Sequence, residues 1–206
     1  MTDVARQLAP ALGHLVDGLL AARAARPGFV RELLAGAAFE MWLSFETRFA
    51  LADRAGWHQL GLDALETDGR HLWIGNEYGK VDLGLVTYAD AGFLTDERWV
   101  LAVEFKVVYN NKNFEDQLAA IAADLRPTRS TKAAIGARLA VVSVVRFDNP
   151  DNRYQRAADR AMTWDHMADR VGELGRLHHV TPATARLADP PRAELGLVIV
   201  EASRAP

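Results

Sequence analysis

The feature that most constrains the fold is the apolar run at residues 98–108, Arg-Trp-Val-Leu-Ala-Val-Glu-Phe-Lys-Val-Val. Valine, tryptophan and phenylalanine make up most of this run, and these residue types favour β-strands. Side chains alternate along a strand, so Glu104 and Lys106 share one face. A carboxylate and an ammonium ion within a buried strand are costly unless they are paired or hold a ligand. The run therefore predicts a buried strand with a site on it.

A second apolar strand is predicted at residues 80–86, and its carboxylate is Asp82. The segment 88–97 is short enough to join the two strands as an antiparallel hairpin, which places Asp82 beside Glu104 and Lys106. Two carboxylates at one point suit a hard divalent cation with oxygen ligands. The alternative is an ordinary Glu104–Lys106 ion pair on a solvated face of the sheet.

Asp82 is followed 22 positions later by Glu104-Phe105-Lys106. This pattern on neighbouring apolar strands resembles the PD-(D/E)xK nuclease superfamily, whose fold is called restriction-endonuclease-like. The resemblance covers residues 28–147, and Val81 stands where the family often has proline. It implies a core of a helix, a three-strand meander, a helix and a further strand. The Asp and the Glu-x-Lys are then expected on the second and third strands of the meander.

The resemblance implies a metal-dependent nuclease that acts on nucleic acid, with DNA as the expected substrate. Asp82 and Glu104 would hold Mg²⁺ or Mn²⁺, with the backbone carbonyl of Phe105 as a further ligand. Lys106 would orient or deprotonate the attacking water. Two alternatives stay open. One is a catalytically silent binding or assembly subunit of a DNA defence or repair complex, and the other is an unrelated α/β protein with a structural ion pair.

A helix is predicted over residues 29–54, because apolar side chains recur there at helical spacing. The expected buried stripe consists of Val30, Leu33, Leu34, Ala37, Ala38, Met41, Trp42, Phe45 and Phe49. In the resembled family this helix often carries an acidic residue that points into the site. Glu46 lies at the edge of the stripe and is assigned this catalytic role. Glu40 lies nearly opposite the stripe, is expected in solvent, and is kept as the accessory candidate.

A further helix is predicted to begin after Asn113, with Phe114, Leu118, Ile121, Ala122 and Leu125 on its buried side. Gln117 lies at the edge of that stripe. Some members of the resembled family have a functional glutamine on this helix, so Gln117 is a second accessory candidate. The basic residues expected to contact nucleic-acid phosphates are Lys112, Arg129 and Lys132.

The remaining periodicities complete an α/β prediction for one domain over residues 1–206, with a mixed sheet flanked by helices. An accessory helix within 1–26, regular from about Pro10, is expected to serve packing or a homodimer. The core spans 28–147, with strands predicted at 70–75 and 137–147. The C-terminal part, 148–206, is expected to hold a helix at 152–174 and a strand at 195–200. The adjacent His178 and His179 have no metal-site spacing and are not assigned to metal.

Composition narrows the function classes. Half of the 206 residues are hydrophobic and a quarter are charged, as in a globular protein with a full core. The absence of cysteine excludes disulfides, thiolate zinc sites and a cysteine nucleophile. No apolar run approaches the roughly 20 residues of a membrane span, and we expect a cytoplasmic protein without membrane contact. The net charge of −3 does not favour nucleic-acid binding, although phosphate contact depends on local patches.

Overall fold

A mixed β-sheet is the centre of the computed structural model, which describes residues 3–26, 28–29, 33, 37–52, 61–66, 69–78, 81–89, 96–126, 135–148, 155–187 and 193–202. Within these residues the sheet has six strands in the order β1-β2-β3-β4-β6-β5. The strands are β1 (Arg70–Tyr78), β2 (Val81–Ala89), β3 (Arg98–Tyr109), β4 (Ala137–Phe147), β5 (Arg176–Leu187) and β6 (Ala193–Glu201). β3 and β4 run parallel, and every other pair of neighbours is antiparallel.

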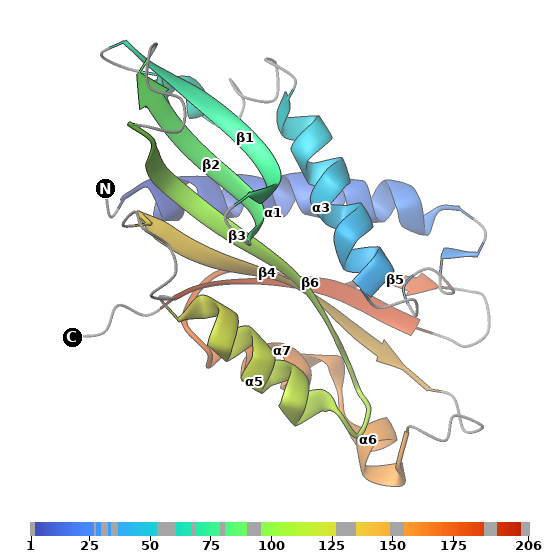
Figure 1. The fold of residues 1–206 in the computed structure, drawn as a ribbon. Coiled ribbons are helices and arrows are strands. Elements are labelled where there is room, and N and C mark those ends of the chain that lie inside the picture. The colour runs from blue at the N-terminus through green and yellow to red at the C-terminus, as the bar shows by residue number, and fades with distance from the viewer. Residues whose placement is uncertain are drawn as a thin grey trace.

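Helices cover both faces of this sheet (Figure 1). Helices α1 (Asp3–Ala24) and α3 (Ala37–Ala52) pack on one face, and α5 (Phe114–Leu125) and α7 (Trp164–Gly172) pack on the other. A 3₁₀ helix, η1 (Leu62–Leu65), precedes β1, and a short helix, α6 (Ala157–Ala161), precedes α7. The predicted α/β class with a mixed sheet is therefore confirmed.

Strands β3, β4 and β6 are buried on both faces, which explains their near-continuous apolar sequences. Alternate residues of β3 point into different cores. Val103 and Phe105 contribute to the core under α1 and α3, whereas Val108 contributes to the core under α5 and α7. Each fully buried side chain of this kind stabilises the fold by about 1.5–3 kcal/mol. The side chains of Glu104 and Lys106 leave β3 on the α5 side, since they alternate with Val103 and Phe105.

The predicted elements around the motif are confirmed. β2 and β3 form the expected antiparallel hairpin pairing, and β4 has the bounds predicted from its sequence. α5 buries Phe114, Leu118, Ile121 and Leu125. β1 is longer than the predicted 70–75, because it continues to Tyr78.

The predicted buried stripe of α3 is wrong in phase. Met41, Phe45 and Phe49 are 56%, 41% and 61% exposed, while the buried side chains are Phe39, Leu43, Ser44, Thr47 and Leu51. Large apolar residues occur on both sides of this helix, so their spacing alone does not select the buried face. Thr47 is tolerated inside because its hydroxyl donates a hydrogen bond of 2.7 Å to the carbonyl of Leu43. Val30 and Leu34 of the predicted stripe lie outside the described residues.

Two other helix predictions are corrected. α1 begins at Asp3 and has Pro10 inside it, and its buried side includes Leu8, Leu12, Val16 and Leu20. The predicted helix at 152–174 is broken, because α6 ends at Ala161 and α7 begins at Trp164. Thr163 starts α7 as a cap whose hydroxyl accepts a hydrogen bond from the backbone N–H of His166 at 3.2 Å.

β5 was not predicted. It is an edge strand that pairs only with β6 in the described sheet, and it contains Pro182. Its pairing with β6 shifts register between Leu177 and His179 and again between Thr181 and Ala185. Proline within a strand is tolerated at such an edge or irregularity, so the sequence lacks an uninterrupted strand pattern here.

Candidate functional site

The site is built where β2 stops pairing with β3. The register between them ends at Leu83 and Val103, whereas β3 continues beside β4 as far as Tyr109. Every second backbone N–H of β3 beyond that point faces the side that β2 has left. Buried N–H groups of this kind need other acceptors.

Three polar side chains from three different elements supply those acceptors. Asp82 Oδ2 accepts from Phe105 N at 2.7 Å, and Glu40 Oε1 accepts from Val107 N at 2.8 Å. Gln117 Oε1 accepts from Tyr109 N at 3.0 Å. β2, α3 and α5 therefore place two carboxylates and an amide in a row along one edge of β3.

Glu104 and Lys106 lie beside this row. Glu104 is buried, and its Oε2 lies 3.5 Å from the Nζ of Lys106. The same Nζ lies 3.0 Å from Oδ2 of Asp124 on α5. Asp82 contacts the backbone between Glu104 and Lys106, and its charge is among the causes that raise the pKa of both residues. Asp124 was missed, although it follows Gln117 by two helical turns and so shares its side of α5.

Electrostatics in the cluster show an excess of negative charge. Burial, and then the neighbouring Asp82, raise the pKa of Glu104 to about 7, against the opposing effect of Lys106. Burial also raises the pKa of Glu40, although the hydrogen bond from Val107 opposes that shift. Burial disfavours the charged form of Lys106, but Asp82, Asp124 and Glu104 outweigh it and raise its pKa to about 12. The carboxylates thus hold the lysine firmly in its charged form and still compete for positive charge.

Glu40 takes the place predicted for Glu46. The expectation that Glu40 faces solvent is wrong, because it shares the buried side of α3 with Leu43, Ser44 and Thr47. Glu46 is half-buried on the same helix, and it is not among the charges that shift the pKa of Glu104 or Lys106. The error follows directly from the wrong phase of the predicted stripe.

The backbone of Asp82 is held by two side chains that the sequence did not single out. Ser44 Oγ donates to the carbonyl oxygen of Asp82 at 2.8 Å, and Asn76 Nδ2 donates to the same oxygen at 3.0 Å. Asn76 also donates to Ser44 Oγ at 2.6 Å. α3 and β1 together fix the start of β2, and with it the direction of the Asp82 carboxylate.

The other predicted site residues lie as follows. Phe105 is fully buried, and its N–H is the group in contact with Asp82. Lys112 is exposed in the turn that follows β3. Arg129 and Lys132 lie outside the described residues.

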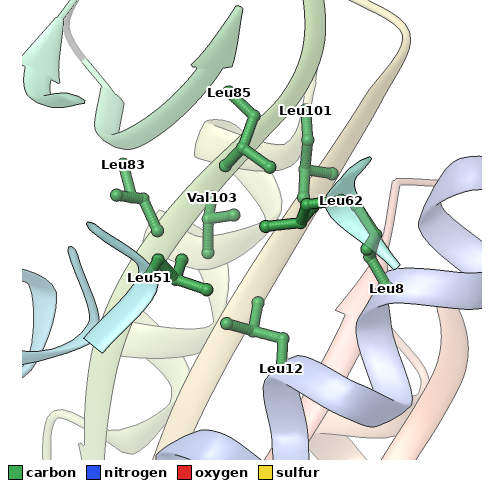
Figure 2. Close-up of a pocket in the computed structure, with 8 residues that line it drawn as sticks. All are labelled: Leu8, Leu12, Leu51, Leu62, Leu83, Leu85, Leu101 and Val103. Atoms are coloured by element: carbon green, nitrogen blue, oxygen red, sulfur yellow. The ribbon is translucent and has the colours of Figure 1, made fainter. Parts of the chain in front are cut away.

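An apolar pocket lies on the α1 and α3 side of the sheet, away from the Glu104 and Lys106 side chains. Figure 2 shows its lining, which is Leu8, Leu12, Leu51, Leu62, Leu83, Leu85, Leu101 and Val103. Ligand sites combine an apolar wall with a few polar groups that orient the ligand. This lining is wholly aliphatic, and we interpret the pocket as a packing space in the core.

No helix in the described part of the chain combines the length and the apolar character needed to cross a membrane. Comparison of the chain with models of protein families, with curated proteins and with solved structures finds no match. The interpretation of the site therefore depends on its own geometry.

Proposed function

We propose that the chain is a metal-dependent nuclease that hydrolyses phosphodiester bonds, most of all in DNA, and that its fold is restriction-endonuclease-like. The order α3, β1, β2, β3, α5, β4 supports this proposal, because it corresponds to the helix, meander, helix and strand that the resemblance implies. Asp82 lies on the second strand of the meander, and Glu104 and Lys106 lie on the third.

The observation that carries the proposal is the gathering of acidic groups at the free edge of β3. Asp82 and Glu40 each use one carboxylate oxygen to accept a β3 N–H group, and Glu104 and Lys106 extend from the same stretch of strand. A structural ion pair needs only one acidic partner. The additional carboxylates are costly to hold together in a partly buried place unless they bind something.

The donor set fits a hard divalent cation. Asp82, Glu104 and Glu40 offer oxygen ligands only, which suit Mg²⁺ or Mn²⁺. Burial, and then the charge of Asp82, raise the pKa of Glu104 to about 7, and a bound cation would favour its charged form. A bound ion of this class lowers the pKa of water and offsets charge on a phosphate.

The charged groups around Lys106 favour a role as a hydrogen-bond donor over a role as a base. Its pKa is raised to about 12, so its ammonium group keeps its proton at neutral pH. It can therefore donate hydrogen bonds to an attacking water or to a phosphate oxygen, but it is a poor base. The contact with Asp124 at 3.0 Å holds the ammonium group in place beside Glu104.

Exposed apolar side chains favour a second candidate function. Met41, Phe45 and Phe49 follow one another along α3, and each is more than 40% exposed. Apolar patches on a surface often mark contacts with other proteins. The second candidate is a catalytically silent binding or assembly subunit, acting with a partner protein or a second copy.

The test is a cleavage assay on plasmid and single-stranded DNA, beside calorimetric titration with Mg²⁺ and Mn²⁺. The proposal predicts cleavage that a chelator stops, and loss of both cleavage and metal binding in Asp82→Asn and Glu104→Gln. Lys106→Ala should lose cleavage but retain metal binding, because the lysine is not a ligand. Asp116→Asn on the exposed side of α5 is the matched control and should behave as the wild type.

The same experiment separates the alternatives. Metal binding at Asp82 and Glu104 without cleavage of DNA or RNA would support the assembly subunit. A protein that binds neither Mg²⁺ nor Mn²⁺ would leave the structural ion pair as the better interpretation.

A further inference from the structure

A second group of metal-ligating side chains lies between α1 and β5. His14 and Asp17 are one turn apart on α1, and His179 meets them from β5. One ligand atom from each of the three lies within 4.8 Å of the other two. Among the described residues, no other set of three or more histidine, aspartate and glutamate side chains meets so closely. β4 and β6 separate this group from β3, so it is independent of the function proposed above.

The spacing within the group is close to that of a metal site. His179 Nε2 lies 2.9 Å from Asp17 Oδ2 and 2.7 Å from Thr181 Oγ1. The Thr181 hydroxyl also donates to the same oxygen of Asp17. In a tetrahedral zinc site with bonds of about 2.0–2.1 Å, neighbouring ligand atoms are about 3.3 Å apart. The Asp17 and His179 atoms lie slightly closer than this, at the distance of a hydrogen bond, so an ion would replace that bond and move the two atoms apart by a few tenths of an ångström. The exposed His14 can approach by side-chain rotation.

The close packing of α1 on β5 is a second observation that favours the approach of His14 and Asp17 to His179. The ring of His179 lies directly on Gly13, where an added Cβ would lie 2.6 Å from ring atoms Cγ and Cδ2. The rings of His14 and His179 meet edge to face, with centroids 5.3 Å apart and planes at 82°. A side chain at position 13 would force the helix away from the strand. The glycine therefore lets both imidazoles and the Asp17 carboxylate reach one point.

We propose that His14, Asp17 and His179 bind a divalent transition-metal ion of the zinc class, with water as the fourth ligand. Imidazole nitrogen selects zinc and its neighbours over Mg²⁺, whereas the oxygen-only group at β3 has the opposite preference. Asp17 and His179 are 162 positions apart in the chain. A metal ion shared between them would join the first helix to the edge strand of the sheet and so add to the stability of the fold.

The test uses protein without a histidine tag, stripped of metal with a chelator. Because zinc also binds oxygen ligands, a variant that carries Asp82→Asn and Glu104→Gln is titrated beside the wild type. Calorimetry should give one Zn²⁺ per chain in the double variant. At a zinc concentration about 100-fold above the dissociation constant, the melting temperature should rise by about 5 °C or more. Mg²⁺ should cause no such rise in the double variant.

Substitutions of the proposed ligands test whether zinc binds at this group. His14→Ala removes an exposed side chain, so it should fold normally and weaken zinc binding by at least about tenfold. Asp17→Asn should weaken binding in the same way, while His166→Ala, an exposed histidine on α7, should bind zinc as the wild type does. Equal zinc affinity in the wild type, His14→Ala and Asp17→Asn would overturn the proposal. So would the absence of any zinc-induced rise in melting temperature, which would leave only a hydrogen-bonded contact among Asp17, His179 and Thr181.

Discussion

The Asp82 carboxylate accepts a hydrogen bond of 2.7 Å from the backbone N–H of Phe105, at the point where β2 leaves β3. A side chain thus takes over the acceptor position that a neighbouring strand would otherwise fill. The residue proposed as a metal ligand is therefore also part of the hydrogen bonding of the sheet, and its two roles can be separated by mutation.

Asp82→Asn and Asp82→Ala should differ in stability. Asparagine keeps an oxygen that can accept from Phe105 N, so its free energy of unfolding should stay close to that of the wild type. Alanine leaves that N–H without its acceptor and should lower the free energy of unfolding by about 1–3 kcal/mol. Urea denaturation of both variants measures the difference. Equal losses in the two would show that the hydrogen bond does not contribute as described.

Glu40→Gln should abolish metal-dependent cleavage with little change in stability, because the amide oxygen can still accept from Val107 N. The charge that would help to hold the ion is lost, however. Glu46→Gln on the same helix is the control, and its cleavage rate should match that of the wild type. The assay is plasmid nicking with Mg²⁺, and inactivation by Glu46→Gln instead would restore the assignment made from the sequence.

The metal-free protein should lose stability as the pH rises from about 4.5 to 7. The pKa of Glu104 is raised in the folded state from 4.5 to about 7, so in this range the folded state binds more protons than the unfolded state. Stability then falls with rising pH, and the contribution of Glu104 levels off above its folded pKa. Glu104→Gln should remove this part of the pH dependence. Denaturant titrations at several pH values, with Asp116→Asn as control, measure the slope.

Leu43→Ala and Phe45→Ala test the phase of α3. Leu43 is 1% exposed, so Leu43→Ala should lower the free energy of unfolding by about 2–5 kcal/mol. Phe45 is 41% exposed, and its truncation should change stability by no more than about 0.5 kcal/mol. Urea denaturation gives both values. A larger loss for Phe45 would instead support the buried stripe predicted from the sequence.

The strand residues of the site could be predicted from the sequence, because the apolar residues next to them in the chain show that each lies in a buried strand. β3 is apolar on both faces, so the charges of Glu104 and Lys106 stand out, and strand alternation places them on one side. Asp82 stands out in β2 for the same reason. The short connection between the strands then brings the three residues together without any knowledge of the rest of the fold.

The helical residues of the site could not be predicted in the same way. α3 carries Phe39 and Leu43 on one side and Met41 and Phe45 on the other, and only its packing on the sheet decides which side is buried. Glu40 was misplaced for this reason. Asp124 and Ser44 contact residues far away in the chain, and no local pattern marks such contacts. His14 and Asp17 are one helical turn apart, but that spacing was not singled out in the sequence, and His179 meets them only because β5 forms.

The irregular pairing of β5 around Pro182 affects how readily another chain can add to this edge of the sheet. An edge strand presents unpaired N–H and C=O groups that another chain can join, and long regular edges promote aggregation. Proline has no N–H to offer, and the shift in register between Thr181 and Ala185 makes this edge irregular. A second molecule therefore finds no straight edge to extend at β5. The irregularity that hides this strand in the sequence therefore also makes the β5 edge a poor template for another chain.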